Sequence, residues 1–292
     1  MTTWLITGGS GQLGTALANE LAERGIDFTA PNSQKLDITN QLEVKKYVGF
    51  FKPEVIVNAA AWTDVDEAET NEPKAFNTNS QGPKHLAIAS REIDARFVQV
   101  STDYVFSGER NLPWDEQSLR NPASVYGNTK SKGEEFTLQE YQEGSYILRT
   151  AWLYSASHKN FATSMSSLAI KNLEPIRVVN DQIGQPTFCL DLSKQLVDLL
   201  LSQAPVGIYH ATNSGQVSWF EYAKEIFKHI GADEARVIPI STSDLKRRAE
   251  RPSYSVLGHE GWARTQLSPM RNWKEALNSA MPSIISGIRR AQ

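Results

Sequence analysis

The chain has little cysteine, no long apolar run and no excess of basic charge, and each scarcity excludes a class of protein. Cys189 is the only cysteine among 292 residues, which excludes an internal disulfide and a multi-cysteine metal site. No apolar run approaches the roughly 20 residues of a membrane-spanning helix. The 30 basic and 33 acidic side chains leave no electrostatic footprint for nucleic acid or an anionic membrane. No basic segment precedes the early glycines, so we expect a cytoplasmic protein without a signal peptide.

What the sequence does contain is an alternation of short apolar runs and amphipathic stretches over its first 150 residues. This alternation predicts an α/β fold, a Rossmann-type doubly wound parallel sheet with helices on both faces. Strands are expected at 4–7, 27–30, 55–57, 97–100 and 146–148, and helices at about 13–24, 40–51, 72–91 and 124–142. The pattern loosens afterwards, with helices expected at 160–171, 191–201, 218–230 and 273–290 and strands at 176–179 and 207–210. We therefore expect a first domain at 1–150 and a smaller C-terminal α/β domain at 151–292, with crossings back to the first.

A glycine-rich segment, Thr7–Gly14, lies between the first predicted strand and the first predicted helix. Gly8 permits the sharp turn, Gly11 lets the backbone approach a pyrophosphate, and Gly14 lets the helix lie close to the sheet. The helix N-terminus then offers free N–H groups and partial positive charge to phosphate. The alternative is a glycine-rich turn without a ligand, but its position favours a dinucleotide site.

The stretch after the second predicted strand bears on which dinucleotide binds. Residues 28–35 contain no acid that would hold a free ribose 2′-hydroxyl, whereas Ser33 and Lys35 suit a 2′-phosphate. This pattern favours NADP(H), with NADH as an option. The alternative is that Ser33 and Lys35 are ordinary polar residues of a loop. Asp37 and Ile38 follow where an acid can reach the adenine amino group. The small residues of the 58–63 segment after the third strand, among them Ala59 and Ala61, leave room for the cofactor.

Tyr126 has a lysine four residues later, and the two share one face of the predicted helix. A phenol titrates near pH 10, and a neighbouring ammonium such as that of Lys130 lowers this pKa, which suits proton transfer to or from a carbonyl oxygen. A surface tyrosine with a solvated lysine is the alternative. Thr102 favours the catalytic interpretation, because it ends the fourth predicted strand, at the sheet edge where ligands bind.

The glycine loop, the strand-end hydroxyl and the Tyr-x-x-x-Lys helix, in this order, resemble the extended short-chain dehydrogenase/reductase family over residues 1 to about 150. Further segments resemble one branch, the dTDP-4-dehydrorhamnose reductases, in family order along nearly the whole chain. They are Asn58–Ala61, Val65–Glu69, Ser101–Phe106, Val125–Lys130, Leu148–Tyr154, Asn160–Ala162, Asn180–Thr187, Gly207–His210 and Ala249–Pro252.

The resemblance implies an oxidoreductase of dTDP-rhamnose biosynthesis, reducing the C4 ketone of dTDP-4-dehydro-L-rhamnose with NADPH. Tyr126 is then the general acid, Lys130 holds the nicotinamide ribose, and Thr102 orients the carbonyl. Asp103 and Trp152 match substrate contacts of the family. The basic run at 246–251 is expected to be a solvated face, with Arg251 as the best candidate contact for the substrate diphosphate. The predicted cofactor contacts, some from the resemblance and some from the patterns above, are Gly8, Gly11, Gln12, Leu13, Gly14, Ser33, Lys35, Asp37, Ile38, Ala59, Ala61, Trp62, Thr63, Tyr126 and Lys130.

The sequence also departs from the family pattern. Trp62 stands where relatives usually have histidine or tyrosine. Some relatives bind magnesium through glutamates at a dimer interface, but the comparable places here, around Ala16 and Leu190, cannot ligate it. We therefore expect no metal. We expect a monomer or weak homodimer, with association with the preceding 3,5-epimerase as an option, and a helix-start acidic patch rather than a metal cluster at 64–69.

Two other classes of function compete with this one: another nucleotide-sugar enzyme of the same family (a reductase, dehydratase or epimerase) and a binding protein without catalytic activity. Dehydratases of the family usually place two acids after the strand-end threonine, and here Tyr104 takes the second place. Epimerases keep NAD bound through an acid after the second strand, which is missing. A non-catalytic NADP-binding regulatory subunit is the rival from another class, but a regulator need not keep Thr102, Tyr126 and Lys130 together.

Overall fold

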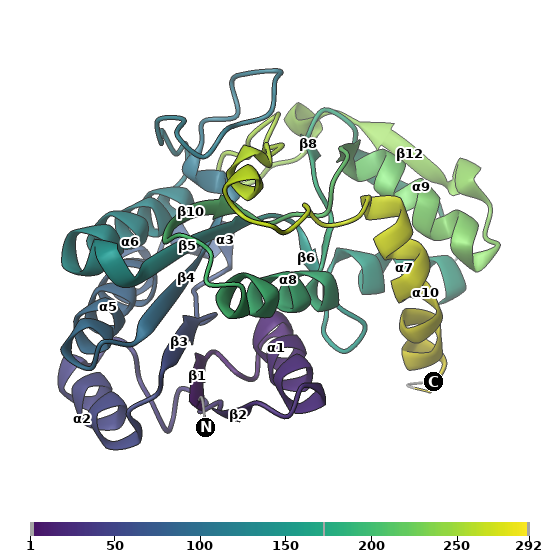
Figure 1. The fold of residues 1–292 in the computed structure, drawn as a ribbon. Coiled ribbons are helices and arrows are strands. Elements are labelled where there is room, and N and C mark those ends of the chain that lie inside the picture. The colour runs from purple at the N-terminus through teal and green to yellow at the C-terminus, as the bar shows by residue number, and fades with distance from the viewer. Residues whose placement is uncertain (1–2, 172, 291–292) are drawn as a thin grey trace.

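The centre of the molecule is a six-stranded parallel sheet, seen edge-on among its helices in Figure 1. The structure is a computed structural model and describes residues 3–171 and 173–290. The strand order is β10-β5-β4-β3-β1-β2. The strands are β1 (Thr3–Thr7), β2 (Asp27–Thr29), β3 (Val55–Asn58), β4 (Arg96–Thr102), β5 (Ser145–Thr150) and β10 (Gly207–His210). This confirms the predicted doubly wound α/β fold.

Successive apolar residues of each strand face opposite layers of helices, as the two-residue period of a strand requires. Trp4 and Ile6 of β1 pack on one side and Leu5 on the other. The first layer holds α1 (Gln12–Glu23) and α8 (Cys189–Leu201), and the second holds α2 (Gln41–Phe51), α5 (Gly82–Glu92) and α6 (Val125–Tyr141). Because both faces are covered, β1 and β3 carry consecutive buried apolar residues, at 4–6 and 55–57.

The helix predicted at 72–91 is not one regular helix. It is divided into α4 (Glu72–Phe76), a π-helical turn η1 (Asn77–Gln81) and α5. A π turn adds one residue to the i→i+4 ladder and is common at functional sites. Here it buries the side chains of Asn79 and Ser80 against Thr129 of α6. The sequence prediction missed this turn because its polar residues carry no periodic signal.

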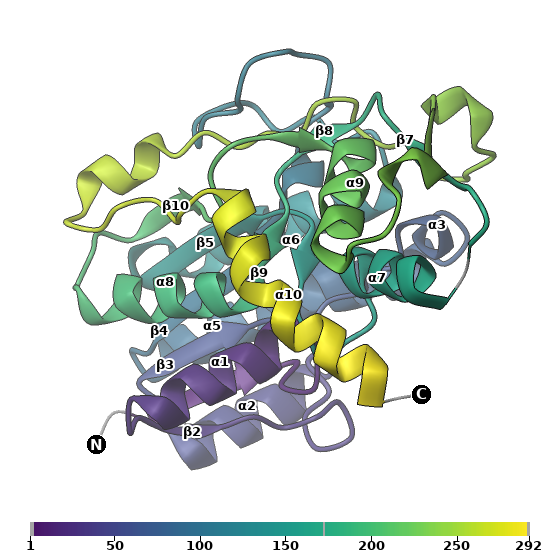
Figure 2. The same ribbon diagram turned by 90° about the vertical axis from the view of Figure 1, so that its right-hand side faces the viewer.

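Beyond residue 150 the chain builds a second region beside the carboxyl ends of the strands, at the right of Figure 1. Figure 2 shows α10 crossing in front of it, with α9 and α7 alongside. Its helices are α7 (Phe161–Lys171), α9 (Trp219–Ile230) and α10 (Trp273–Arg290). Its strands are β6 (Leu153–Tyr154) with β9 (Thr187–Phe188), β7 (Ile176–Val179) with β12 (Val237–Ile240), and β8 (Ile183–Gly184) with β11 (Val217–Ser218). Aromatic side chains, including Tyr154, Phe188, Tyr222 and Trp273, dominate its core.

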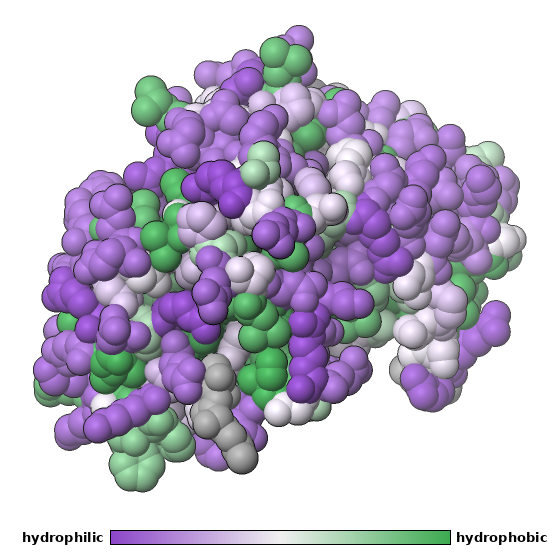
Figure 3. All heavy atoms as spheres, viewed as in Figure 1, coloured by the Kyte–Doolittle hydropathy of each residue, from purple (hydrophilic) through white to green (hydrophobic). Residues whose placement is uncertain are grey.

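Short helical turns complete the chain. They are α3 (Val65–Ala68) and the 3-10 turns Asp103–Val105, Gln142–Gly144, Glu234–Arg236, Thr242–Asp244 and Glu260–Arg264. The face in Figure 3 is largely hydrophilic, with apolar side chains scattered across it. Across 3–171 and 173–290, each helix is too short or too polar to span a membrane.

Candidate active site

The glycine loop fits a pyrophosphate because side chains are sterically excluded from it. Gly8 has φ +69°, and a Cβ there would lie 2.6 Å from the backbone nitrogen of Ala60. A Cβ on Gly14 would lie 2.2 Å from the carbonyl oxygen of Gly8. Gly11 caps α1 without a side-chain hydrogen bond, so the first turn of the helix keeps its backbone donors for a ligand. The cradle therefore suits the phosphates of a dinucleotide.

The predicted ribose and adenine contacts lie beside this loop, at the end of β2. Lys35 lines a separate hollow of about 560 Å³, together with Asn32, Tyr47 and Phe51, whereas Ser33 does not line it. Ala30, which also lines the hollow, contacts the space that a Cβ on Gly9 would fill, so the hollow adjoins the phosphate loop. A 2′-phosphate contact from Ser33 and Lys35 stays a prediction.

Asp37 and Ile38 occupy different environments in this part of the fold. The carboxylate of Asp37 accepts hydrogen bonds from the backbone and hydroxyl of Thr39 at 2.9 and 2.8 Å. Ile38 is buried against Gly82, where a Cβ would collide with the isoleucine side chain. Their predicted adenine contacts are likewise untested by the structure.

Hydrogen bonds from the π turn fix the backbone of the segment that follows β3. The backbone N–H of Trp62 donates to Asn79 Oδ1 at 2.8 Å, and Asn79 Nδ2 donates back to the Trp62 carbonyl at 3.0 Å. The indole N–H of Trp62 donates to the Asp64 carbonyl. Ala59, Ala61 and Thr63 line the main cavity, but Trp62 does not. Asn79 is thus a site residue that sequence reasoning missed.

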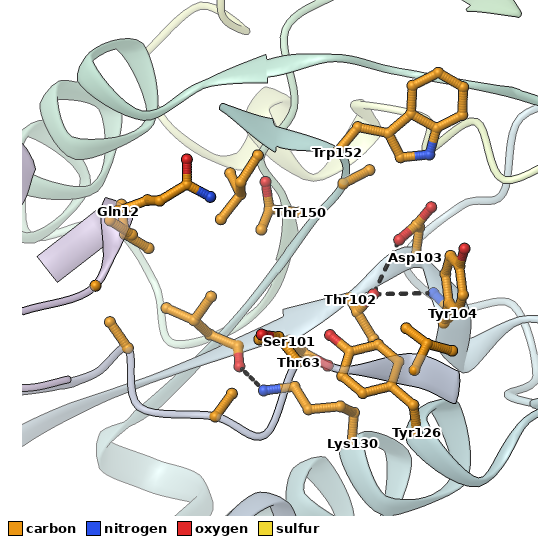
Figure 4. Close-up of a pocket in the computed structure, with 18 of the residues that line it drawn as sticks. Gln12, Thr63, Ser101, Thr102, Asp103, Tyr104, Tyr126, Lys130, Thr150 and Trp152 are labelled. Atoms are coloured by element: carbon orange, nitrogen blue, oxygen red, sulfur yellow. Dashed lines mark hydrogen bonds between the residues drawn. The ribbon is translucent and has the colours of Figure 1, made fainter. Parts of the chain in front are cut away.

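A cavity of about 750 Å³ lies between the glycine loop, the ends of β4 and β5, and the C-terminal region. Figure 4 shows Thr102, Tyr126 and Lys130 on one side of it, with Trp152 and Gln12 across the space. The predicted residues that line it are Gly11, Gln12, Leu13, Ala59, Ala61, Thr63, Thr102, Asp103, Tyr126, Lys130 and Trp152. The predicted residues that do not are Gly8, Gly14, Ser33, Lys35, Asp37, Ile38, Trp62 and Arg251.

Thr102, Tyr126 and Lys130 come together through the packing of α6 on β4. The hydroxyl of Thr102 donates to Asp103 Oδ1 at 2.9 Å and accepts from the backbone N–H of Tyr104 at 3.2 Å. The amine of Lys130, buried at 4% exposure, donates to the Val100 carbonyl at 2.7 Å. Ser124 caps α6 by accepting from the Gly127 N–H, which places the tyrosine in the first turn.

The expectation that Lys130 lowers the pKa of Tyr126 is wrong in direction. Burial raises the pKa of the Tyr126 phenol to about 12, although a hydrogen bond with Thr102 opposes the rise. Burial also lowers the pKa of the Lys130 ammonium to about 8, against the attraction of Glu134. Burial disfavours the charged form of each group, and the neighbouring Asp103 carboxylate also raises the pKa of Tyr126. Tyr126 is therefore a protonated phenol at neutral pH, able to give a proton.

Asp103 supplies a carboxyl group beside these residues. Burial raises its pKa to about 6, against hydrogen bonds from Ser255 and Thr102. The side chain is only 2% exposed and belongs to the lining of the cavity. A carboxyl group with this pKa changes its protonation state just below neutral pH.

An aromatic pair forms the wall of the cavity in the C-terminal region. Trp152 stacks on Trp219 with ring centroids 3.5 Å apart and planes at 9°. Trp152 holds a left-handed backbone at φ +45°, an uncommon conformation for a bulky residue. Gly184 lies under the indole, where a Cβ would be 2.5 Å from the ring. Sequence reasoning assigned no role to Gly184 or Trp219, because the two are joined to Trp152 only by the fold.

Arg251 pairs with Asp66, an acid of the predicted helix-start patch at 64–69. Its guanidinium bonds Asp66 Oδ2 at 2.8 Å, and Arg247 approaches the same oxygen at 3.6 Å. Partial burial opposes ionisation, but the Ala249 N–H and the two arginines outweigh it and lower the pKa of Asp66. Part of the basic run at 246–251 is thus an ion-pair network.

The other acids predicted in the same patch are structural. Asp64 caps α3 by accepting from the Glu67 N–H at 2.9 Å. Glu69 accepts from the Val125 N–H at the first turn of α6, also at 2.9 Å. Throughout 3–171 and 173–290 no group of three potential ligands is arranged to hold a metal ion.

A loop at 155–160 joins the C-terminal region to the phosphate loop. Gln12 Oε1 accepts hydrogen bonds from Asn160 Nδ2 at 2.9 Å and from the Ser155 hydroxyl at 3.2 Å. His158 Nε2 lies 3.0 Å from the carbonyl oxygen of Ser10. Lys159 lines the cavity beside them. The loop therefore closes the phosphate end of the cavity.

A doubly wound sheet, a glycine loop shaped by close backbone contacts, and a Tyr–Lys pair in the cavity at the strand ends define an NAD(P)-dependent oxidoreductase of the short-chain dehydrogenase/reductase type. The family model for the RmlD substrate binding domain matches residues 1–285, so the chain belongs to that family. This confirms the resemblance found in the sequence.

Characterised relatives and solved structures agree with this assignment. The dTDP-4-dehydrorhamnose reductase of Streptomyces griseus is 44% identical, over 96% of this chain and 93% of the relative. The dTDP-4-keto-6-deoxy-D-glucose reductase of Streptomyces niveus is 39% identical over 96% of each. The structure of the Bacillus anthracis dTDP-4-dehydrorhamnose reductase in complex with NADP is 36% identical, with a TM-score of 0.92 over 97% of this chain and 99% of that one.

Proposed function

We propose that the chain reduces the C4 ketone of dTDP-4-dehydro-L-rhamnose to dTDP-L-rhamnose with NADPH, the last step of dTDP-rhamnose biosynthesis. The convergence of Tyr126, Thr102 and Lys130 in one cavity carries this proposal. The coarser assignment, an NAD(P)H-dependent reductase of dTDP-sugars, rests on the relatives and on the NADP-bound structure.

Tyr126 is the general acid. NADPH, when bound, supplies the hydride for the ketone carbon. The phenol, protonated because its pKa is about 12, gives its proton to the ketone oxygen as negative charge develops there. Thr102 orients the same oxygen, and Lys130 holds the nicotinamide ribose hydroxyls with its ammonium group. Thr102 and Lys130 are buried and Tyr126 is partly buried, which limits the access of water to the reacting atoms.

The sugar nucleotide is held by Trp152, across the cavity from Tyr126, and by polar groups from both regions of the fold. Trp152 provides an apolar face fixed by Trp219 and Gly184. Asp103 accepts a hydrogen bond from a sugar hydroxyl. Arg251, whose guanidinium is fixed by Asp66, attracts the substrate diphosphate. We assign residues 151–292 mainly to this substrate side and residues 1–150 to NADP(H).

The cofactor contacts follow the geometry of the glycine loop and its neighbours. Gly8 and Gly14 shape the loop, while Gly11, Gln12 and Leu13 present it to the cavity. Ala59, Ala61, Trp62 and Thr63 flank it after β3, Asp37 and Ile38 hold the adenine, and Ser33 with Lys35 takes the 2′-phosphate. We expect no metal requirement.

The experiment is NADPH oxidation, followed by absorbance, with dTDP-4-dehydro-L-rhamnose generated in situ. The parallel assay uses the unepimerised dTDP-4-dehydro-6-deoxy-D-glucose. Oxidation with the first substrate, undiminished by EDTA, supports the proposal. Oxidation with only the second would replace it by another dTDP-sugar 4-ketoreductase, the alternative that the Streptomyces niveus relative favours. NADPH binding without oxidation of either would point to a regulatory subunit.

A further inference from the structure

A buried ion pair lies behind the proposed active site, on the side away from the cavity. Glu134 of α6 is fully buried, and Arg149 of β5 is 1% exposed. Arg149 donates to both carboxylate oxygens, from Nε at 2.9 Å and from Nη2 at 2.8 Å. Arg120 adds a third contact at 3.4 Å. Removing one member of such a pair leaves an uncompensated buried charge, which is strongly destabilising.

The pair reaches the active site by two routes. The hydroxyl of Ser101 donates to Glu134 Oε1 at 2.5 Å, and Ser101 immediately precedes Thr102 at the end of β4. Glu134 also follows Lys130 by four residues on α6, so the two side chains share one helix face. The same carboxylate therefore touches the strand that carries the threonine and lies one turn from the lysine.

We propose that Glu134, clamped by Arg149, is a positioning residue that keeps the Lys130 ammonium charged and holds the end of β4 where Thr102 meets the substrate. This inference rests on the proposed function, since it explains how Lys130 keeps a charge in a dry pocket. The bidentate geometry fixes the carboxylate, which leaves it no freedom to follow substrate or cofactor.

The charged groups around Lys130 leave Glu134 as its main stabilising neighbour. Glu134 raises the pKa of Lys130 while burial lowers it, and the result is about 8. Arg149, near the end of β5, and Asp103, in the turn after β4, act at longer range, through Glu134 and Tyr126 respectively. Glu69 lies at the first turn of α6.

The π turn and α5, which also pack against α6, place no charge beside Lys130. The π turn presents the uncharged Asn79 and Ser80 to Thr129. Lys84 of α5 is directed to Glu140, near the far end of α6. Without the charge of Glu134, nothing would offset the effect of burial on the pKa of Lys130. The guanidinium of Arg149, left without its counter-charge, would lower that pKa further.

The test is the Glu134→Gln variant, with Glu135→Gln as its matched control. Glu135 is the next residue on α6, but it faces outward and pairs with Lys132. In the wild type, kcat/KM and NADPH affinity should fall as pH rises through about 8, the pKa of Lys130. In Glu134→Gln this alkaline limb should move down by about one pH unit or more. NADPH affinity, measured by fluorescence without any sugar, should show the same shift, and the control should match the wild type.

A merely structural role predicts a different result. Glu134→Gln would then lower the thermal unfolding midpoint and leave the alkaline limb of NADPH binding in place, which would overturn the proposal. Replacing both charges, Glu134→Gln with Arg149→Met, should return the limb part of the way towards the wild type. If the alkaline limb of the double variant lay at the same pH as that of Glu134→Gln alone, the charge argument would be contradicted.

Arg149→Lys keeps the proposal testable if Glu134→Gln does not fold. It preserves the charge and loses the bidentate clamp, so we expect kcat to fall several-fold with the limb unmoved. An unchanged kcat would overturn the proposal that Glu134, clamped by Arg149, positions the end of β4. Failure of the proposed function would look different, since wild-type enzyme would then fail to oxidise NADPH while its binding limb remained.

Discussion

The two ends of the cavity are built by opposite means. The nucleotide end is made from the backbone of one continuous segment, 7–14, where steric exclusion of side chains is the essential property. The sugar end is made from side chains that the fold gathers from distant positions, such as Trp152, Gly184 and Trp219. A local backbone motif is easy to recognise in a sequence, and its glycines do not tolerate added side-chain atoms. A wall built from side chains of distant segments is hard to predict from sequence, and single substitutions can alter it one contact at a time.

Tyr126→Phe changes the reaction centre, where the nucleotide end and the sugar end of the cavity meet. This substitution should have the largest effect on turnover. Removing the phenol hydroxyl removes the proton donor, and general acid catalysis is worth about 10² to 10⁴ in rate. We expect kcat to fall by at least about 10². NADPH and sugar nucleotide should bind with nearly unchanged affinity, because the ring still fills its place against Tyr104. Near-normal turnover would show that another group donates the proton.

Gly14→Ala tests the nucleotide end alone. The new Cβ would lie 2.2 Å from the Gly8 carbonyl, so the loop must move. We expect NADPH affinity to drop by about tenfold or more, which corresponds to ~1.4 kcal/mol. Gly49→Ala on α2 is the control, since a Cβ there meets no atom within 4 Å. Fluorescence titration of both variants gives the comparison, and equal affinities would contradict the steric argument.

The same contrast explains which parts of the molecule could be predicted from sequence. The sheet, most helices, the glycine loop and the Tyr126–Lys130 pair follow from local periodicity and spacing. The π turn that presents Asn79 does not, because polar residues buried by tertiary contacts carry no periodic signal. The direction of the Tyr126 pKa shift was mispredicted because burial, the main cause of the rise, is a property of the folded chain.

The sugar end was predicted only through resemblance to a family. Trp152 was named in that way, but its left-handed backbone and the glycine beneath it depend on β8, some 30 residues further along the chain. The pairing of Arg251 with Asp66 joins residues 185 positions apart, which no local pattern encodes. Contacts of this range appear only in the folded structure.

Gly184→Ala tests the gathered wall. Its Cβ would press into the indole of Trp152 and push the ring into the space of the sugar nucleotide. Overpacking of this kind typically costs about 1–3 kcal/mol. We therefore expect KM for the sugar nucleotide to rise about tenfold, with NADPH affinity unchanged. Steady-state kinetics with both substrates varied would show this, and an equal loss for NADPH would mean that the two ends are not separable.

The pH dependence of the sugar end sharpens the comparison further. The Asp103 carboxylate should bind a sugar hydroxyl best when ionised, so KM for the sugar nucleotide should fall several-fold as pH rises through about 6. NADPH affinity should be flat over the same range. Asp103→Asn should abolish the acid limb in KM. The raised pKa also means that the folded protein binds this proton more tightly, so the associated stability is lost as pH rises through about 6.

Asp66→Asn should have the smallest effect, because its pair with Arg251 is partly exposed. Partly exposed ion pairs contribute little to stability, typically up to about 1 kcal/mol. The lowered pKa of Asp66 means that its contribution is present above the ordinary pKa of an aspartate and is lost as pH falls through the lower, folded value. We expect KM for the sugar nucleotide to change about two- to threefold and more strongly at low salt, since Arg251 loses its anchor. Glu72→Gln, an exposed acid on α4, is the control, and a salt dependence equal in both variants would separate Arg251 from the substrate diphosphate.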